Sequence, residues 1–331
     1  MSPLCNFGPE QVTSVSWKDT VRPRSDFDTR RAPSPRNLQA KVRRCKIFSF
    51  DAHECSAITR FQGDLLAVGT RSGFVQIWNA VTRQRVRTLA GHTQRVGNLA
   101  WNGELLTTGS RDRRILHRDS RTGAQSIATL TAHRQEICGL KWDVPNNKLA
   151  SGGNDNRLLV WDYINANPIH TFAEHTAAVK AIAWNPHQRG ILASGGGTAD
   201  KTIKIWDINV GQQKVTRDTG SQVCNLAWSQ NENELLSTHG YSQNHIAVWE
   251  PDTMDGIVTL TGHCSRVLYL AKHPDGEIIA TGAGDETVMF WFVPPSASLP
   301  RLAGRPSFAG NLALLPRCRR PDSRLRRVFF L

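Results

Sequence analysis

The stretch HTAAVKAIAWNPHQRGILASGGGTADKTIKIWD, residues 175–207, carries all the marks of a unit that recurs along the chain. A histidine opens it, the short apolar run VKAIAW follows, and the alternating run IKIW closes it. Asp200 lies 25 residues after His175 and six residues before Trp206. Short apolar and alternating runs bounded by turn residues are typical of β-strands. The unit therefore predicts several short strands joined by tight turns.

All ten tryptophans of the chain fall at two positions of this unit. The apolar runs end in Trp17, Trp101, Trp142, Trp184 and Trp228, and the alternating runs end in Trp78, Trp161, Trp206, Trp249 and Trp291. A sixth apolar run, residues 267–272, has Lys272 in the tryptophan's place, and the steps from Trp101 to Lys272 are 41, 42, 44 and 44 residues. A repeat of about 40–45 residues with these marks is typical of an all-β WD40 propeller with one four-stranded blade per repeat.

Histidine and aspartate also recur in step with the repeat. The histidines before the apolar runs are His92, His133, His175 and His263, and the aspartates that follow them are Asp112, Asp155, Asp200 and Asp285. Tryptophan lies six residues after the last three of these aspartates, at Trp161, Trp206 and Trp291. Catalysis or metal binding would need such a set once, whereas recurrence in four blades favours a buried structural relay of paired polar groups.

Two blades depart from this pattern. Arg118 replaces tryptophan after Asp112, Gly220 replaces the histidine before Ser221, and Asn244 stands near an aspartate position. We expect these two blades to depend more on packing than on the relay.

Charge and cysteine usage narrow the class of protein. The net charge of +13 comes from residues 18–62, which carry +6, and residues 292–331, which carry +7, so the repeats are electrically balanced and nucleic acid is not an expected partner. The sequence contains no run of 18 or more uncharged apolar residues, so a membrane span is not expected. It has no positively charged start followed by an apolar core, so secretion is not expected either. Seven scattered cysteines without CxxC pairs predict free thiols in a reducing compartment, with no metal, disulfide or cofactor.

The repeat divides the chain into four parts. Residues 1–17 are expected to begin the first recognisable blade, residues 63–291 to form the propeller, and residues 292–331 to be a basic tail. Residues 18–62 form a basic insertion after the first strand, and such a long loop is either functional or disordered. We expect disorder in this insertion and in the tail. Both basic segments are also candidates for translated intron or a shifted reading frame. The first strands are predicted to begin at 12, 96, 137, 179, 223 and 267, which leaves open a closed six-bladed ring or a larger ring lacking a blade.

Several linear motifs are more specific than the general repeat. The blocks GGGTAD, THGYSQN, HRQEICGLKW and GAGDETVMFW, with their surroundings in residues 1–17 and 63–291, resemble the fizzy and fizzy-related family, with the fizzy-related branch favoured. The resemblance implies a seven-bladed propeller that recruits substrates to the anaphase-promoting complex, a ubiquitin ligase, in the nucleus and cytoplasm. The family's Asp-Arg-aromatic-Ile-Pro ligase motif, first blade and Ile-Arg end are not found in this sequence.

The loops before the first strands and the turns that hold the aspartates are expected on one face. The residues just before the apolar runs are Arg95, Glu136, Ala178, Gln222 and Arg266. Such cationic and amide groups suit a short polar peptide. The resemblance implies that this face holds a Lys-Glu-Asn degron, with contacts from Asn154, Asn156, Thr198, Gln222 and Arg266. Arg266 would pair with the degron glutamate.

The resemblance also implies a second pocket, for an Arg-x-x-Leu destruction motif, to which Glu286 would contribute. Its other wall would come from the blade not found here, so we expect the pocket to be defective.

Three functions compete. The first is a non-catalytic substrate adaptor of the ligase, and the second is a scaffold or decoy uncoupled from the ligase. The third, an enzyme, is disfavoured because the glycines of residues 195–197 and 282–284 do not open a helix after a strand, as a phosphate-binding loop requires.

Overall fold

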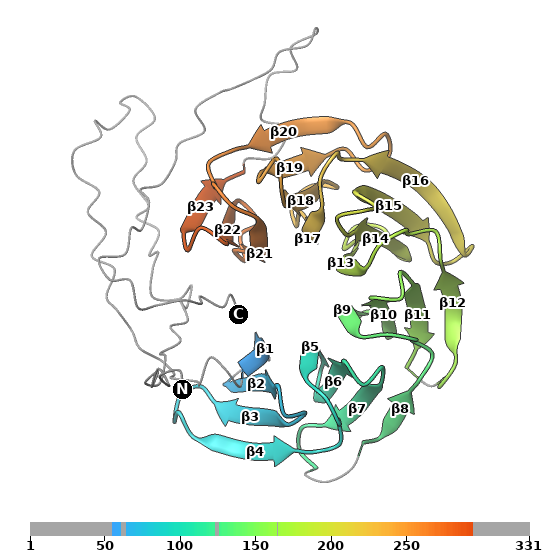
Figure 1. Cartoon of the computed structure of the whole chain (residues 1–331), viewed down its shortest axis with the longest axis vertical. Helices are drawn as coiled ribbons and strands as arrows, with labels where there is room; N and C mark the ends of the chain where they lie inside the picture. The colour runs from blue at the N-terminus through green and yellow to red at the C-terminus, as the bar shows by residue number, and fades with distance from the viewer. Residues whose placement is uncertain (1–54, 61–63, 123–125, 164, 294–331) are drawn as a thin grey trace, which may run out of the picture.

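The computed structural model describes residues 55–60, 64–122, 126–163 and 165–293, all of whose regular elements are β-strands. They form six sheets, five of four strands and one of three, arranged around a common axis (Figure 1). The described residues include no helix that is long and apolar enough to cross a membrane. The prediction of an all-β propeller with six recognisable blades is confirmed.

Each blade is a meander of consecutive antiparallel strands, with its first strand nearest the axis (Figure 1). Blade 1 contains β1 (Cys55–Arg60), β2 (Leu65–Thr70), β3 (Val75–Asn79) and β4 (Arg85–Leu89), and blade 2 contains β5 (Val96–Asn102), β6 (Leu105–Ser110), β7 (Ile115–Asp119) and β8 (Ala128–Leu130). Blade 3 contains β9 (Ile137–Asp143), β10 (Lys148–Gly153), β11 (Leu158–Asp162) and β12 (Pro168–Phe172), and blade 4 contains β13 (Val179–Trp184), β14 (Ile191–Gly196), β15 (Thr202–Asp207) and β16 (Gln212–Asp218). Blade 5 contains β17 (Val223–Trp228), β18 (Leu235–His239), β19 (Ile246–Trp249) and β20 (Gly256–Leu260), and blade 6 contains β21 (Val267–Lys272), β22 (Ile278–Ala283) and β23 (Val288–Phe292).

The start of the first blade differs from the prediction. The strand that pairs with β2 is β1, so residues 55–60 belong to the propeller and not to the insertion assigned to residues 18–62. The strand CSAITR was missed because it ends in Arg60 where the other apolar runs carry tryptophan or Lys272. Residues 12–17, chosen for their tryptophan, and the rest of the insertion lie outside the described residues. At the other end, Phe292 closes β23 instead of beginning the tail, most of which also lies outside them.

The hydrophobic core is divided among the spaces between neighbouring blades. Five clusters of buried side chains join blade 1 to 2, 2 to 3, 3 to 4, 4 to 5 and 5 to 6. In the part of the chain that the structure describes, no cluster joins blade 6 to blade 1. Blades 2 to 5 therefore each share a core with two neighbours, whereas blades 1 and 6 each share a core with one.

A hydrogen-bonded relay crosses the interior of blades 3, 4 and 6. In blade 4, Trp206 Nε1 donates to Ser194 Oγ at 2.7 Å, Ser194 Oγ lies 2.7 Å from His175 Nε2, and His175 Nδ1 hydrogen-bonds Asp200. Ser151 takes the place of Ser194 in blade 3, and Thr281 takes it in blade 6. With a neutral imidazole, each donor in the chain meets one acceptor, so the buried polar groups are satisfied. The predicted structural relay is thus present.

The carboxylate end of the relay also organises backbone. Burial alone would raise the pKa of Asp155, but hydrogen bonds from His133 and from the backbone N–H of Arg134 outweigh it and hold the pKa below its usual value. Asp112, Asp155 and Asp285 each accept one backbone N–H from the loop before the inner strand and one from their own turn, so each holds both segments.

Blade 5 has a relay that the sequence did not suggest, so the expectation that it depends mainly on packing is wrong. His239, on β18, replaces the missing loop histidine and contacts Ser237 Oγ at 2.7 Å and Ser221 Oγ at 3.1 Å. Trp249 Nε1 donates to the same Ser237 at 2.7 Å. The imidazole of His245 stacks on His239 with ring centroids 4.3 Å apart. The polar chain is preserved although its histidine comes from a strand.

Blade 2 keeps part of its relay. His92 contacts Thr108 Oγ1 at 2.8 Å and Asp112 Oδ2 at 2.9 Å. Arg118, in the tryptophan position, is buried and its Nε has no hydrogen-bond partner among the described residues. Burial lowers the pKa of Arg118. Blade 2 thus retains the histidine and the carboxylate of the relay and lacks only the indole donor.

Lys272 retains a hydrogen bond that tryptophan makes at its position. Trp184 Nε1 donates to the carbonyl of Lys141 at 3.1 Å, and Trp228 Nε1 donates to the carbonyl of Ala183 at 3.0 Å, each reaching the inner strand of the preceding blade. Lys272 Nζ likewise donates to the carbonyl of Trp228. A donor at the end of the inner strand therefore ties blade 6 to blade 5.

We predict that Ser194→Ala lowers the free energy of unfolding by about 2–3 kcal/mol, because a buried indole N–H and a buried imidazole nitrogen both lose their partner. Urea unfolding followed by tryptophan fluorescence measures the change. The control is Ser126→Ala, at an exposed loop position. An equal loss in the two variants would contradict a structural role for the relay.

We predict that His239 makes the protein acid-sensitive. Burial, and secondarily the charge of His245, lowers the pKa of His239 from 6.5 to about 3 in the folded chain. The unfolded chain therefore binds a proton more readily, and the contribution of His239 to stability, fully present above pH 6.5, is lost as the pH falls towards 3. Between pH 6 and 4, this one imidazole is expected to lower the free energy of unfolding by about 1.4 kcal/mol for each unit by which the pH falls.

The measurement is the urea-unfolding free energy of wild type and His239→Asn at several pH values. The variant is expected to be less stable at pH 7 and to have the shallower slope. Asparagine in place of the exposed His187 is the matched control. A slope unchanged by His239→Asn would show that this imidazole does not remain neutral in the folded protein.

Candidate functional site

A repeated backbone hydrogen bond brings the predicted site residues to one face. In each case, the backbone carbonyl of the residue before an inner strand accepts a hydrogen bond from a backbone N–H of the same blade. The donor is the first residue of the turn between the second and third strands. This bond joins Arg111 N to Arg95 O (3.0 Å), Asn154 N to Glu136 O (2.8 Å), Gly240 N to Gln222 O (2.9 Å) and Gly284 N to Arg266 O (3.0 Å). In blade 4 the same approach places Gly197 against Ala178. The loops and turns of five blades therefore share the face at which the inner strands begin, here called the entry face.

Gln222 and Arg266 lie close together on this face. A Cβ placed on Gly240 would come 3.2 Å from Gln222 Oε1 and 3.4 Å from Arg266 Cγ, so the two side chains flank this glycine from neighbouring blades. The guanidinium carbon of Arg266 lies 5.4 Å from the ring centroid of Tyr241, within the range of a cation–π contact. Arg266 is exposed and forms no ion pair with any described carboxylate.

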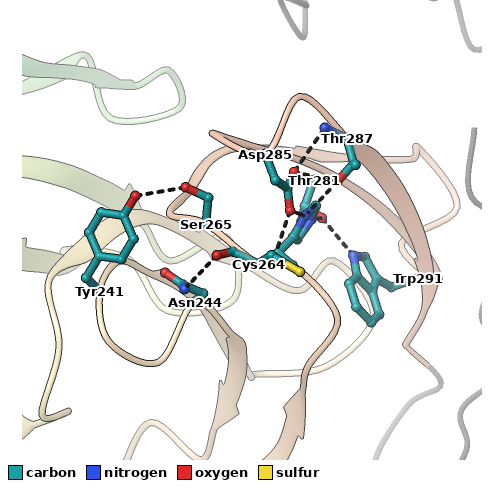
Figure 2. A network of polar contacts seen from close by, with 9 residues as sticks. Tyr241, Asn244, Cys264, Ser265, Thr281, Asp285, Thr287 and Trp291 are labelled. Atoms are coloured by element: carbon teal, nitrogen blue, oxygen red, sulfur yellow. Dashed lines mark hydrogen bonds and ion pairs between the residues drawn. The ribbon is translucent and has the colours of Figure 1, made fainter. Parts of the chain in front are cut away.

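The turn that carries Tyr241 is tied to the loop of blade 6, as Figure 2 shows. Tyr241 Oη lies 3.0 Å from Ser265 Oγ, and Asn244 Nδ2 donates to the carbonyl of Cys264 at 3.3 Å. The next link is Cys264 N, which donates to Asp285 in the relay of blade 6 at 2.9 Å. The loop that carries Arg266 is therefore held by the turn of blade 5 and by the relay aspartate of its own blade.

Asn154 and Thr198 are exposed in the corresponding turns of blades 3 and 4. Asn154 Oδ1 accepts from Cys138 Sγ at 2.9 Å, which leaves its amide donors directed away from that thiol. The side chain of Thr198 has no hydrogen-bond partner among the described residues. Both are available to a ligand on the entry face.

Asn156 differs from the other four predicted residues. Its φ is 61°, and its Nδ2 donates to the carbonyl of Thr176 at 3.1 Å, as Asn244 does to Cys264 in the next blade but one. This side chain links its turn to the loop of the following blade. Glu286 occupies the same turn position, with φ of 61°, so its place is set by the backbone of the turn that follows Asp285.

Arg95 and Glu136 neutralise each other. Arg95 Nε and Nη2 donate to the two carboxylate oxygens of Glu136, each at 2.7 Å, and this bond raises the pKa of Arg95. A bidentate pair of this kind is geometrically specific. It bridges blades 2 and 3, so neither side chain is free to bind a ligand without breaking this pair.

Lys180 and Tyr241 belong to the entry face but were not among the predicted residues. Lys180 is the exposed second residue of β13, and its charge acts on both Cys138 and Cys224, which precede and follow it in neighbouring blades. Burial nevertheless raises the pKa of each thiol to about 11, as expected for packing groups. The cysteines that the structure describes form no disulfide with one another. The signal that could have found Tyr241 is its place in the turn motif THGYSQN, directly after the glycine that Gln222 and Arg266 flank.

The described residues hold no cluster of histidine, cysteine and carboxylate that could bind a metal ion. The entry face therefore offers amides, a hydroxyl, an aromatic ring and cations that form no ion pair with a described residue, Arg266 and Lys180 among them. This chemistry suits an extended polar peptide that carries a carboxylate.

Comparison with known proteins agrees with this architecture. The family model described as the CDC20/Fizzy WD40 domain matches residues 37–291, which include β1. A solved chain in "Crystal Structure of Mitotic Checkpoint Complex" superposes with a TM-score of 0.73 at 41% identity, covering 75% of this chain and 78% of that one.

Curated relatives carry the names of one branch. "Protein FIZZY-RELATED 1" of Arabidopsis thaliana is 52% identical over 274 residues, covering 83% of this chain and 57% of the relative. "APC/C activator protein CDH1" of Saccharomyces cerevisiae is 52% identical over 229 residues, covering 69% of this chain and 40% of the relative. The chain thus spans about half the length of the curated relatives that it matches. On these matches, the chain belongs to the CDC20/Fizzy family of WD40 proteins, in its fizzy-related branch.

Proposed function

We propose that the chain is a non-catalytic, substrate-recognising co-activator of the anaphase-promoting complex. It binds Lys-Glu-Asn degrons of cell-cycle substrates on its entry face and promotes their ubiquitin-dependent proteolysis. The observation that carries the proposal is the pairing of an unneutralised Arg266 with Gln222 around Gly240, beside the exposed Tyr241. The name of the yeast relative, an activator of the ligase, supports the same function.

The recognition chemistry follows from these contacts. Arg266 is held by Tyr241 without a carboxylate partner among the described residues, so its guanidinium can donate charge-assisted hydrogen bonds to the carboxylate of the degron glutamate. Gln222, Asn154 and Thr198 supply donors and acceptors for the degron asparagine and for peptide backbone. Asn156 acts by fixing its turn through Thr176, so its contribution is to the shape of the site.

A second candidate function is a propeller that binds substrates or other proteins without activating the ligase. The exposed groups of the entry face can bind a peptide whether or not the chain also docks on the ligase, so peptide binding and activation of the ligase are tested separately. A scaffold or decoy would retain the first property and lack the second.

We predict that Arg266→Ala weakens binding of a Lys-Glu-Asn peptide by about 1.5–3 kcal/mol, the usual cost of losing a hydrogen bond to a charged group. Fluorescence anisotropy of a labelled peptide measures the Kd. Alanine at Arg189, in the exposed turn between β13 and β14 at the opposite end of the inner strands, is the matched control.

Two further measurements sharpen this test. A peptide with glutamine in place of the degron glutamate should bind wild type weakly. Its affinity should fall little further when Arg266 is replaced by alanine. If Arg266→Ala binds both peptides as wild type does, the entry face is not the degron site.

We predict that the full chain, added to the purified ligase, increases ubiquitination of a substrate bearing the Lys-Glu-Asn degron and that Arg266→Ala abolishes most of the increase. The measurement is a reconstituted ubiquitination time course. Peptide binding without any increase in ubiquitination would replace the co-activator proposal with the scaffold or decoy.

A further inference from the structure

The charges of the repeats balance overall but are unevenly distributed around the ring. Residues 64–122, in blades 1 and 2, contain ten arginines, no lysine and four acidic residues. Residues 165–293, from β12 to β23, contain eight basic and thirteen acidic residues. Complementary charge favours an acidic ligand on the first of these parts and disfavours it on the second. In the described chain, an acidic partner is therefore expected at blades 1 and 2.

Three of these arginines share the turn between β6 and β7 of blade 2. Arg111, Arg113 and Arg114, here called the arginine turn, are exposed, and none forms an ion pair with a described residue. Asp112, the one carboxylate of this turn, faces inward, with its side chain 4% exposed. Its Oδ2 contacts His92 Nδ1 at 2.9 Å, and its Oδ1 accepts from Arg114 N at 3.0 Å. The three guanidinium groups are therefore left for a ligand.

The arginine turn occupies in blade 2 the place that two asparagines occupy in blade 3. Arg111 and Asn154 each donate their backbone N–H to the residue before the inner strand of their own blade, at 3.0 and 2.8 Å. Two residues later, Arg113 and Asn156 have φ of 71° and 61°. Blade 2 thus presents arginine on the entry face at both positions where blade 3 presents an amide.

A short chain of contacts joins the arginine turn to the candidate peptide site. The backbone N–H of Arg111 is bonded to Arg95, and the side chain of Arg95 is bonded to Glu136. The carbonyl of Glu136 in turn accepts from Asn154 N. Since Arg95 neutralises the carboxylate of Glu136, this link does not repel an acidic chain. A peptide that contacts Asn154 can therefore reach the arginine turn within a few residues, at about 3.3 Å for each extended residue.

Blade 1 adds a fourth arginine beside this turn. Arg71 is exposed in the turn between β2 and β3 and forms no ion pair with a described residue. A Cβ placed on Gly73, in the same turn, would come 3.1 Å from the carbonyl oxygen of Gln94. The turn of blade 1 thus lies against the loop that leads to Arg95, to which the arginine turn is bonded. The basic surface extends over two neighbouring blades.

We propose that the arginine turn and Arg71 bind a run of aspartate or glutamate residues that flanks the degron in the same substrate chain. The inference rests on the proposed peptide site and names a class of substrate for it, namely degrons with an acidic flank. Guanidinium groups form charge-assisted, often bidentate, hydrogen bonds with carboxylates. A peptide fits better than a nucleic acid, because the arginine turn continues a site whose amides suit peptide groups.

Labelled peptides test the proposal by fluorescence anisotropy with the full chain at low ionic strength. One carries Lys-Glu-Asn between glutamate flanks, one carries it between serine flanks, and one has the glutamate flanks with alanines in place of the degron. Wild type is expected to bind the first about three- to tenfold more tightly than the second, as for a few exposed ion pairs, and high salt should remove the difference. The double variant Arg111→Asn/Arg113→Asn should lose this preference and bind the serine-flanked peptide as wild type does. Asparagine occupies both positions in blade 3, so the turn can accommodate it.

The matched control is Arg83→Asn/Arg189→Asn, which removes the same charge from exposed turns at the opposite end of the strands. Arg83 has φ of 59°, so its replacement also matches that of Arg113 in backbone conformation. The control should retain the preference for glutamate flanks. An equal loss in both double variants would replace the site with a general attraction between opposite charges, and no preference in wild type would refute it outright.

Two further results separate this inference from the proposed function. Arg266→Ala should weaken both degron peptides and leave binding of the peptide without a degron unchanged. If Arg266→Ala has no effect while the arginine turn still governs the preference for glutamate flanks, the degron site is wrong and the acidic site stands. Displacement of the glutamate-flanked peptide from the arginine turn by a lower concentration of a single-stranded oligonucleotide would overturn the proposal in favour of a nucleic acid.

Discussion

The buried hydroxyl at the centre of each relay is the constraint on which the fold and the candidate site both depend. In blades 3 to 6 it is the hydroxyl of Ser151, Ser194, Ser237 or Thr281, which accepts an indole N–H and contacts an imidazole. In three of these blades that imidazole sits in the loop before the inner strand and holds an aspartate of the following turn. One oxygen deep in each sheet thereby connects the packed core to the loops that display Asn154, Thr198 and Arg266.

Most of the architecture was predictable because its determinants recur. A tryptophan spacing of 41 to 44 residues can arise only from a repeated unit, and this fixed five of the six blade starts. The first was missed because its strand, CSAITR, lacks the tryptophan mark and lies next to residues rich in arginine and proline. The relay of blade 5 was missed for a related reason. A histidine on a strand and a histidine in a loop can reach the same buried hydroxyl, and spacing along the chain does not distinguish the two routes.

The site was predictable in position but less so in detail. The register of the repeat placed Asn154, Thr198, Gln222 and Arg266 on one face, and the repeated backbone hydrogen bonds place them there. Which of them are free to bind depends on contacts between blades, which sequence does not reveal. Asn156 is held by Thr176, Arg95 is paired with Glu136, and Arg266 rests on Tyr241. Each of these contacts joins two neighbouring blades.

The division of the core into five shared layers has a mechanical consequence. In the described part of the chain, blade 6 has three strands and a single packed neighbour, so it should fray more readily than the interior blades. Arg266 belongs to this terminal blade, whereas Asn154 and Thr198 belong to interior ones. A peptide that contacts both Asn154 and Arg266 would link the terminal blade to an interior one. Its binding would therefore also slow the opening of blade 6.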